Sequence, residues 1–209
     1  MTDCILAADI GTTSLKIGLI SMKGDLVSLA TARNLQKDAR FCGSNWLQTL
    51  RFAFNKLKNK SECNIIGMCV SGNGPTVVTE NGLTIRWDEE TPIPEDFAEK
   101  ENPLIKFSLF LPKILHLKNN FPKEFEKSKY IFSGPEYVLY QLTGNPITIL
   151  PENRYEAAYW TDDALKICGI PTEKMPPFVE IGDFAGNLLP EQSEILGLPK
   201  KLPVFCGGP

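Results

Sequence analysis

The chain contains a single histidine, His116, and its six cysteines include no Cys-x-x-Cys pair. A structural zinc site needs four nitrogen or sulfur ligands at short, regular spacings, so we expect no zinc centre of the common kinds. Cys4, Cys69 and Cys206 lie inside apolar runs that are typical of strands. Cysteines in such runs are usually buried free thiols, which persist in reducing compartments, and we therefore expect a cytoplasmic protein.

Long apolar runs and an excess of basic residues are also missing. No apolar stretch approaches the roughly 18 residues that a membrane-spanning helix needs. The chain begins with Met1-Thr2-Asp3 and has no basic segment before its first apolar run, which argues against a signal peptide. The formal net charge is −3, so the chain has no bulk attraction to nucleic acid or to anionic lipid. We expect neither a nucleic-acid partner nor a membrane partner.

The overall composition is that of an ordinary globular protein, with 43% hydrophobic and 22% charged residues. A chain of 209 residues can bury a sizeable core, and it lies between the usual sizes of one domain and of two. Strand-like apolar runs and amphipathic helical patterns follow one another along the chain, which predicts an α/β fold.

The N-terminal segment predicts a β-hairpin. Residues 5–8 form an apolar run that ends at Asp9, and a Gly-Thr-Thr-Ser turn follows at residues 11–14. Apolar residues then alternate through residues 15–20, as in a half-buried strand. A turn at residues 23–25 leads into a third strand, so we expect a three-stranded meander.

The tip of this hairpin has the residue types that phosphate groups require. Gly11 allows the backbone to approach a ligand closely, and successive N–H groups in a turn can form an anion-binding concavity. Asp9 is a hard oxygen ligand suited to Mg²⁺ or to one of its waters. The candidate phosphate-binding residues are Gly11, Thr12, Thr13, Ser14 and the cation Lys16. The alternative is an ordinary hairpin whose Asp and Gly only form the turn.

Further elements follow from periodicity and turn residues. Ser44 is a suitable N-cap for a helix that ends near Lys58, and a buried strand is predicted over residues 64–70. Asn81-Gly82 is a strong turn signal for a second hairpin. Residues 88–103 are acidic and rich in proline, so we expect them to be an exposed excursion.

The second half of the chain predicts several helices and two strands. Ser133 and Glu136 have the spacing of a capping box at the start of one helix, and Gly144 suits its end. Thr161 precedes another helix that ends before Gly169. The predicted helices cover residues 112–119, 134–142, 161–168 and 190–196, and the predicted strands cover residues 178–181 and 203–206.

Six segments of the chain are distinctive and occur in a fixed order. The first is Asp-Ile-Gly-Thr-Thr-Ser-Leu-Lys at residues 9–16. The others are Ser-Gly-Asn-Gly-Pro at 71–75, Ile-Arg-Trp-Asp-Glu at 85–89, Leu-Pro-Lys-Ile-Leu at 111–115, Tyr-Val-Leu-Tyr-Gln-Leu-Thr-Gly at 137–144 and Leu-Pro-Val-Phe-Cys-Gly-Gly at 202–208. Together they resemble the FGGY family of carbohydrate kinases, xylulokinases in particular, and residues 9–16 look like the first phosphate motif of that family.

This resemblance implies an α/β domain of the actin-like ATPase (ribonuclease H-like) fold, in which helices flank a mixed sheet. It implies ATP-dependent phosphorylation of a small sugar or polyol, a pentulose of the xylulose type first, with ATP and Mg²⁺ as cofactors. Asp9 would be the catalytic and metal-binding residue. The implied sugar contacts are Asn73, Gly74, Trp87, Asp88 and Glu89. The alternatives are a glycine-rich turn at Asn73 and Gly74 and a core position for Trp87.

The sequence departs from the family at several of these positions. Many members carry a Gln-Met-His run where this chain has Asn73-Gly74-Pro75. Glu89 stands where they have an aspartate, and Thr91 stands where an arginine often follows. These differences leave the identity of the sugar open.

The resemblance also implies that residues 1–209 are the N-terminal, sugar- and phosphate-binding domain. Family members place a general-base aspartate just after the Gly-Gly pair, whereas this chain stops at Pro209. That acid and the C-terminal nucleotide-binding domain would then be missing, and we expect the fragment to lack turnover. A homodimer is compatible with the family. The alternatives are a non-catalytic sugar-sensing member of the same fold and, less favoured, an actin-like ATPase of the chaperone or cytoskeletal type.

Overall fold

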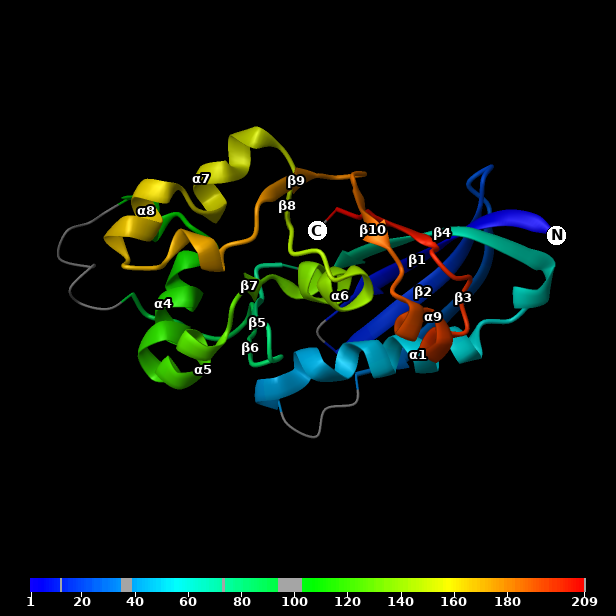
Figure 1. The fold of residues 1–209 in the computed structure, drawn as a ribbon, viewed down its shortest axis with the longest axis horizontal. Coiled ribbons are helices and arrows are strands. Elements are labelled where there is room, and N and C mark those ends of the chain that lie inside the picture. Colours follow the sequence, from blue (N-terminus) through cyan, green and yellow to red (C-terminus); the bar gives the residue numbers. More distant parts are fainter. Residues whose placement is uncertain (12, 35–38, 73, 94–102, 209) are drawn as a thin grey trace.

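The computed structural model describes residues 1–11, 13–34, 39–72, 74–93 and 103–208, and its centre is a six-stranded mixed sheet (Figure 1). The strand order is β10-β11-β4-β1-β2-β3. The three N-terminal strands form an antiparallel meander, while β4 and β11 join in parallel. The strands are β1 (Thr2–Ile10), β2 (Ser14–Ser21), β3 (Leu26–Arg33), β4 (Cys63–Gly72), β10 (Phe184–Asn187) and β11 (Pro203–Cys206).

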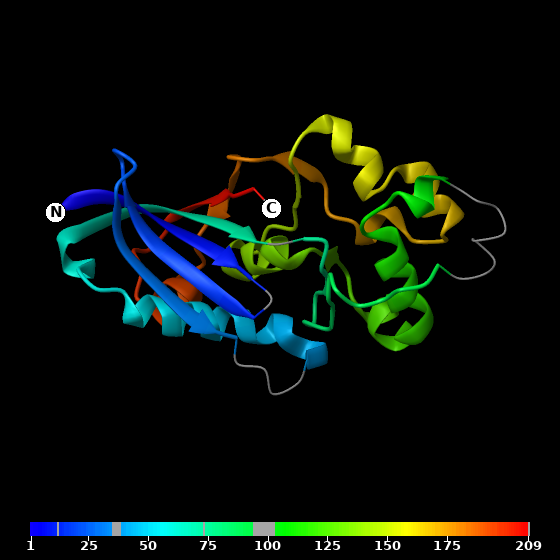
Figure 2. The same cartoon turned by 180° about the vertical axis from the view of Figure 1, so that it is seen from behind.

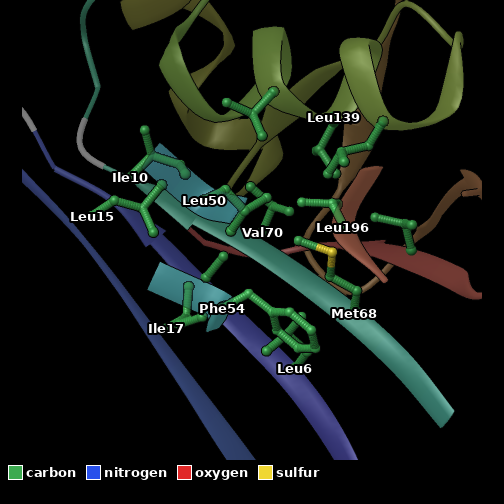
Figure 3. Packing of buried hydrophobic residues seen from close by; sticks show 14 of the residues in the cluster. Leu6, Ile10, Leu15, Ile17, Leu50, Phe54, Met68, Val70, Leu139 and Leu196 are labelled. Atoms are coloured by element: carbon green, nitrogen blue, oxygen red, sulfur yellow. The ribbon is translucent and has the colours of Figure 1, made fainter. Parts of the chain in front are cut away.

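Alternating apolar residues of these strands bury one face of the sheet against helices. Figure 3 shows Leu6 and Ile10 of β1 with Met68 and Val70 of β4 beneath Leu139 of α6. A strand turns every second side chain to the same face, so this alternation builds a continuous apolar surface. The covering helices are α1 (Trp46–Lys56), α6 (Gly134–Thr143) and α9 (Pro190–Leu196).

Figures 1 and 2 show a second lobe beside the large sheet. This lobe has its own hydrophobic cluster. It contains a three-stranded sheet in the order β6-β5-β7 and a parallel pair of β8 and β9. Its strands are β5 (Val77–Thr79), β6 (Thr84–Ile85), β7 (Ile131–Phe132), β8 (Thr148–Leu150) and β9 (Phe178–Glu180). Its helices are α3 (Pro103–Lys106), α4 (Leu111–Asn120), α5 (Pro122–Lys127), α7 (Glu156–Tyr159) and α8 (Asp162–Ile167). The short 3-10 turns are η1 (Ala39–Asn45), η2 (Lys60–Glu62), η3 (Asn153–Tyr155) and η4 (Thr172–Lys174).

Most of the predicted elements are confirmed. The meander, the buried strand β4 and the hairpin around Gly82 are present, and Gly82 adopts the positive φ of 88° that such a turn requires. Thr161 accepts a hydrogen bond from the Ala164 N–H as the N-cap of α8. No helix among the described residues is long and apolar enough to cross a membrane.

One predicted N-cap and one predicted capping box are wrong, although Ser133 does occupy the N-cap position of α6. The Ser44 cap fails because the backbone is already helical before α1 begins: the 3-10 turn η1 runs into it, and its N-cap is Asn45. Ser133 and Glu136 form no capping box, since Ser133 makes no capping hydrogen bond. The Glu136 carboxylate instead accepts a hydrogen bond from the Ile149 N–H at 2.9 Å, because β8 passes beside the start of α6.

Candidate functional site

Three parallel strands of the large sheet end at the same edge. Asp9, near the end of β1, is the register partner of Ser71 near the end of β4. The last residues of β11 pair with Met68–Val70 of β4, so Gly207 follows at the same edge. In Figures 1 and 2 this edge faces the second lobe. Ligands of open α/β sheets bind beyond the carboxyl ends of such strands, so this edge is the candidate site.

The backbones at this edge are in close contact. The Gly207 N–H donates to the Val70 carbonyl at 2.7 Å, and the Ser71 hydroxyl donates to the Gly208 carbonyl. A Cβ atom on Gly207 would lie 2.6 Å from the Val70 oxygen, and one on Gly72 would lie 2.8 Å from the Ile10 oxygen. Both distances are too short for any side chain, so glycine is needed where β4 meets its two neighbours.

The tip of the β1–β2 hairpin is held by its own turn and by β3. The Gly11 N–H donates to the Ser14 carbonyl at 3.1 Å, and a Cβ atom on Gly11 would lie only 2.6 Å from that oxygen. The Asn34 side-chain amide donates to the Gly11 carbonyl at 2.9 Å, and the Asn34 backbone N–H donates to the Thr13 carbonyl at 3.0 Å. Asn34 was not predicted, because it has no local sequence signal and it reaches Gly11 only because β3 returns beside the tip.

Asp9 and Lys16 are directly opposite each other across the β1–β2 ladder. Residues opposite each other in an antiparallel pair point to the same face, with Cβ atoms about 5 Å apart. Both side chains are exposed, and Thr13 is exposed beside them. The structure therefore brings together Asp9, Gly11, Thr13, Ser14 and Lys16, whereas Thr12 lies outside the described residues.

The Asp9 carboxylate at this edge suits Mg²⁺ in one particular way. The described residues contain no group of three or more His, Cys, Asp or Glu side chains that could hold a metal by themselves. Mg²⁺ commonly keeps several waters and is bound by one or two carboxylates together with the phosphates of a substrate. Asp9 therefore fits an ion that a nucleotide phosphate would help to hold, and it does not fit a metal bound by protein ligands alone.

The predicted sugar contact Asp88 is engaged by an arginine. The Arg86 guanidinium binds the Asp88 carboxylate through two bonds, Nε to Oδ1 at 2.9 Å and an Nη to Oδ2 at 2.6 Å. The hydrogen bond from Arg86 lowers the pKa of Asp88. Trp87 is 48% exposed, so it does not fill the core.

Glu89 belongs to the same charged cluster. Its carboxylate accepts a hydrogen bond from the Arg86 N–H at 2.9 Å and forms an ion pair with Arg40. The Lys113 ammonium donates to the Glu89 carbonyl at 3.2 Å, and burial lowers the pKa of Lys113. Arg40, Arg86, Asp88 and Glu89 line a cavity of about 310 Å³. The basic members of the cluster were not predicted, because Arg40 and Arg86 come from two separate segments.

Gly74 lines a different cavity, one of about 350 Å³. Gly74 is two residues beyond Gly72, so the cavity begins within about 7 Å of the end of β4. Its floor is aromatic: the Phe110 and Tyr159 rings are 4.7 Å apart at their centroids. The lining residues are Gly74, Pro75, Leu109, Phe110, Pro151, Tyr155, Ala158 and Tyr159. Asn73 lies outside the described residues.

Similarity to known proteins identifies the family of this chain. The sequence model of the FGGY family of carbohydrate kinases, N-terminal domain, matches residues 82–209. The chain belongs to this family. It is 26% identical to the xylulose kinase of Bacillus subtilis over 98% of the chain, and 20% identical to the xylulose kinase of Escherichia coli over 97% of the chain. Each match covers 47% of the relative, so the chain spans about half the length of these relatives.

The fold of solved FGGY kinases agrees with this assignment. The xylulose kinase of Rhodospirillum rubrum superposes with a TM-score of 0.79 at 20% identity, over 98% of this chain and 49% of that one. The glycerol kinase of Plasmodium falciparum with ADP superposes with a TM-score of 0.76 at 17% identity, over 99% of this chain and 48% of that one. The prediction of an actin-like ATPase fold with a mixed sheet and flanking helices is confirmed.

Proposed function

We propose that this chain is the sugar- and phosphate-binding half of an ATP-dependent carbohydrate kinase. The observation that carries the proposal is the meeting of Asp9, the hairpin tip and the Gly-Gly end of β11 at one sheet edge in a member of the FGGY family. Residues 1–209 would form the N-terminal domain. The nucleotide-binding domain and the general base would lie in a further half, which the doubled length of the relatives supports.

In this proposal each group at the edge has one task. The backbone N–H groups of the hairpin tip and the Thr13 hydroxyl hold the phosphoryl group that is transferred, and Lys16 offsets its charge. Asp9 binds Mg²⁺ or orients its waters, and the ion, when bound, neutralises charge on the phosphate oxygens. Phosphoryl transfer depends mainly on such positioning and charge neutralisation, so this side of the site needs no nucleophile of its own.

The acceptor that we propose is a pentulose of the xylulose type. The xylulose kinases among the relatives support this choice, while a gluconate kinase and a glycerol kinase among the similar structures define the competing acceptors. The cavity at Gly74 is our proposed position for the acceptor, because it opens beside the end of β4.

The first experiment measures ligand binding by thermal shift and calorimetry with D-xylulose, D-gluconate and glycerol, each with and without Mg-ATP. A ligand at a hundredfold excess over its Kd stabilises the folded state by about 2.7 kcal/mol. We expect D-xylulose to stabilise this chain more than the other two compounds do. Equal, negligible shifts with all three, in this chain and in the full-length protein, would contradict the proposed acceptor.

The second experiment measures sugar-dependent ADP release. We expect the full-length protein to show turnover and this chain alone to show none. Asp9→Asn in the full-length protein should lower kcat by about 10²-fold or more, as the removal of one group that stabilises transition-state charge does in other enzymes. Asp3→Asn is the matched control, because Asp3 is exposed at the opposite end of the same strand. Unchanged turnover after Asp9→Asn would contradict the role of Asp9.

A sugar-sensing protein without turnover is the second candidate. The departures from the family pattern at residues 73–75 and at Thr91 favour it, because they change segments for which the resemblance implies a place near the substrate. This candidate predicts sugar binding by the full-length protein with no release of ADP above a blank without sugar.

A further inference from the structure

Two buried cysteines are in contact at the N-terminal end of the large sheet. The Sγ atoms of Cys4 on β1 and Cys63 on β4 are 3.1 Å apart. Their exposed fractions are 0% and 7%, and both belong to the hydrophobic cluster beneath α1. The strands are parallel neighbours, with Thr2 opposite Cys63 and Cys4 opposite Ile65. A disulfide needs an S–S distance of about 2.05 Å, so the sulfur atoms must approach by about 1 Å. Because the register offsets Cys4 and Cys63 by two residues, the start of β1 must also shift relative to β4 for the bond to close.

One of the two thiols borders an open cavity. Cys63 lines a cavity of about 400 Å³ together with Phe54, Lys60, Ser61 and Asn64. Pockets of this size admit small molecules. The Lys60 ammonium on its wall, which donates to the Phe54 carbonyl at 3.0 Å, adds a positive charge that favours an anionic disulfide compound such as glutathione disulfide. Cys63 is therefore the more accessible of the two cysteines, since Cys4 is 0% exposed and does not line this cavity.

We propose that Cys4 and Cys63 form a reversible disulfide when the folded protein meets glutathione disulfide. The Cys63 thiolate attacks one sulfur of glutathione disulfide, forms a mixed disulfide and releases one glutathione thiolate. The Cys4 thiolate then attacks Cys63 Sγ, forms the Cys4–Cys63 bond and releases the second glutathione thiolate. The two protein thiols lose two protons and two electrons, and glutathione disulfide takes them up to become two molecules of glutathione.

The order of the two steps follows from the surroundings of each sulfur. Burial, together with the hydrogen bond to Cys63, raises the pKa of the Cys4 thiol to about 11, so Cys4 is disfavoured as the first thiolate to attack. The start of β1 can open locally, because Thr2 and Asp3 are exposed and the buried part of the strand begins only after them. The bond would tie the start of β1 to β4, and these two strands carry Asp9 and Ser71 at their other ends.

The test uses the folded chain in glutathione buffers of increasing oxidised fraction, followed by acid quenching, alkylation and tryptic mass spectrometry. The bond joins the peptide of residues 1–16 to the peptide of residues 61–86, with the loss of two hydrogen atoms. The second peptide also contains Cys69, so the assignment is made in Cys69→Ser. We expect this link to exceed every other cysteine pair by about tenfold or more, because its sulfur atoms are already in contact.

The variants separate the two steps. Cys4→Ser should accumulate glutathione on Cys63, and Cys63→Ser should give no link. Cys69 and Cys206 form the matched comparison: they lie on adjacent strands, but the β4–β11 register places Cys69 opposite Phe205 and turns the two thiols to opposite faces. The proposal is overturned if the folded Cys69→Ser chain shows no link, if the link appears only in urea, or if wild type links Cys69 to Cys206 equally well.

Discussion

Glu136 is a buried acid whose ionisation should make the stability of this protein depend on pH. Its side chain is 2% exposed at the start of α6. One carboxylate oxygen accepts the Ile149 N–H, and the other has no partner among the described atoms. Burial raises the pKa of Glu136 from its ordinary value of 4.5 to about 7, because the charged form loses its hydration.

The sign and size of the effect follow from linkage. The folded protein binds this proton more tightly than the unfolded chain does, so the stabilisation is complete below pH 4.5 and is lost as the pH rises through about 7. At about 1.4 kcal/mol for each pKa unit, the loss is about 3 kcal/mol. The nearby groups stay neutral in this range, since burial raises the pKa of Tyr159 and raises that of Cys206 to about 12.

Glu136→Gln tests this reasoning. Glutamine keeps an oxygen for the Ile149 N–H, and its amide donor replaces the acid proton, so the two proteins should have similar stability at pH 5. At pH 8 the variant should be more stable by up to about 3 kcal/mol, because it carries no buried charge. Urea unfolding from pH 5 to pH 8 measures this difference, with the exposed Glu126→Gln as control. A wild-type-to-variant difference that stays constant over this range would refute the argument.

Two further predictions concern the free energy of unfolding in urea. Gly207→Ala places a Cβ atom 2.6 Å from the Val70 oxygen and should cost about 1–3 kcal/mol, whereas Gly74→Ala meets a single ordinary contact at 3.9 Å and should cost less than about 0.5 kcal/mol. Equal losses would contradict the close packing at the sheet edge. Lys174 donates to three carbonyls at the end of α5, at 2.9, 3.3 and 2.6 Å, so Lys174→Met should cost about 1.5–3 kcal/mol. The exposed Lys123→Met is its control, and a similar small effect of both would show that these bonds contribute little.

Elements with a strong local pattern could be predicted from the sequence. The alternation after Gly11 and the turn at Gly82 each have one strongly preferred local structure, and both are confirmed. The short helix α9 and the last strand β11 have the predicted bounds, because prolines mark their starts. Strands such as β8 and β10 were missed, since three or four residues have too little periodicity to indicate a strand before their partners are known.

The candidate site likewise has parts that local sequence patterns predicted and parts that they did not. The hairpin motif indicated phosphate chemistry from adjacent residues, and the FGGY assignment rests on motifs that can be read in order along the chain. The aromatic cavity at Gly74 was not predicted, because Phe110 and Tyr159 reach it from separate elements. The ion pair between Arg40 and Glu89 joins residues 49 positions apart and likewise has no signal in either segment.

The strand alternation, the turn that follows Asp9 and the motifs of a kinase family can be read from the sequence alone, since each depends on residues that are close together in the chain. Which distant residues meet depends on the tertiary structure. Parallel pairing aligns Asp9 with Ser71 and brings Ser71 to Gly208, which is 137 residues away. The same pairing of β1 with β4 puts Cys4 against Cys63. Parallel strands need long crossover connections, so their register is set by packing of the whole sheet and cannot be read from a local motif.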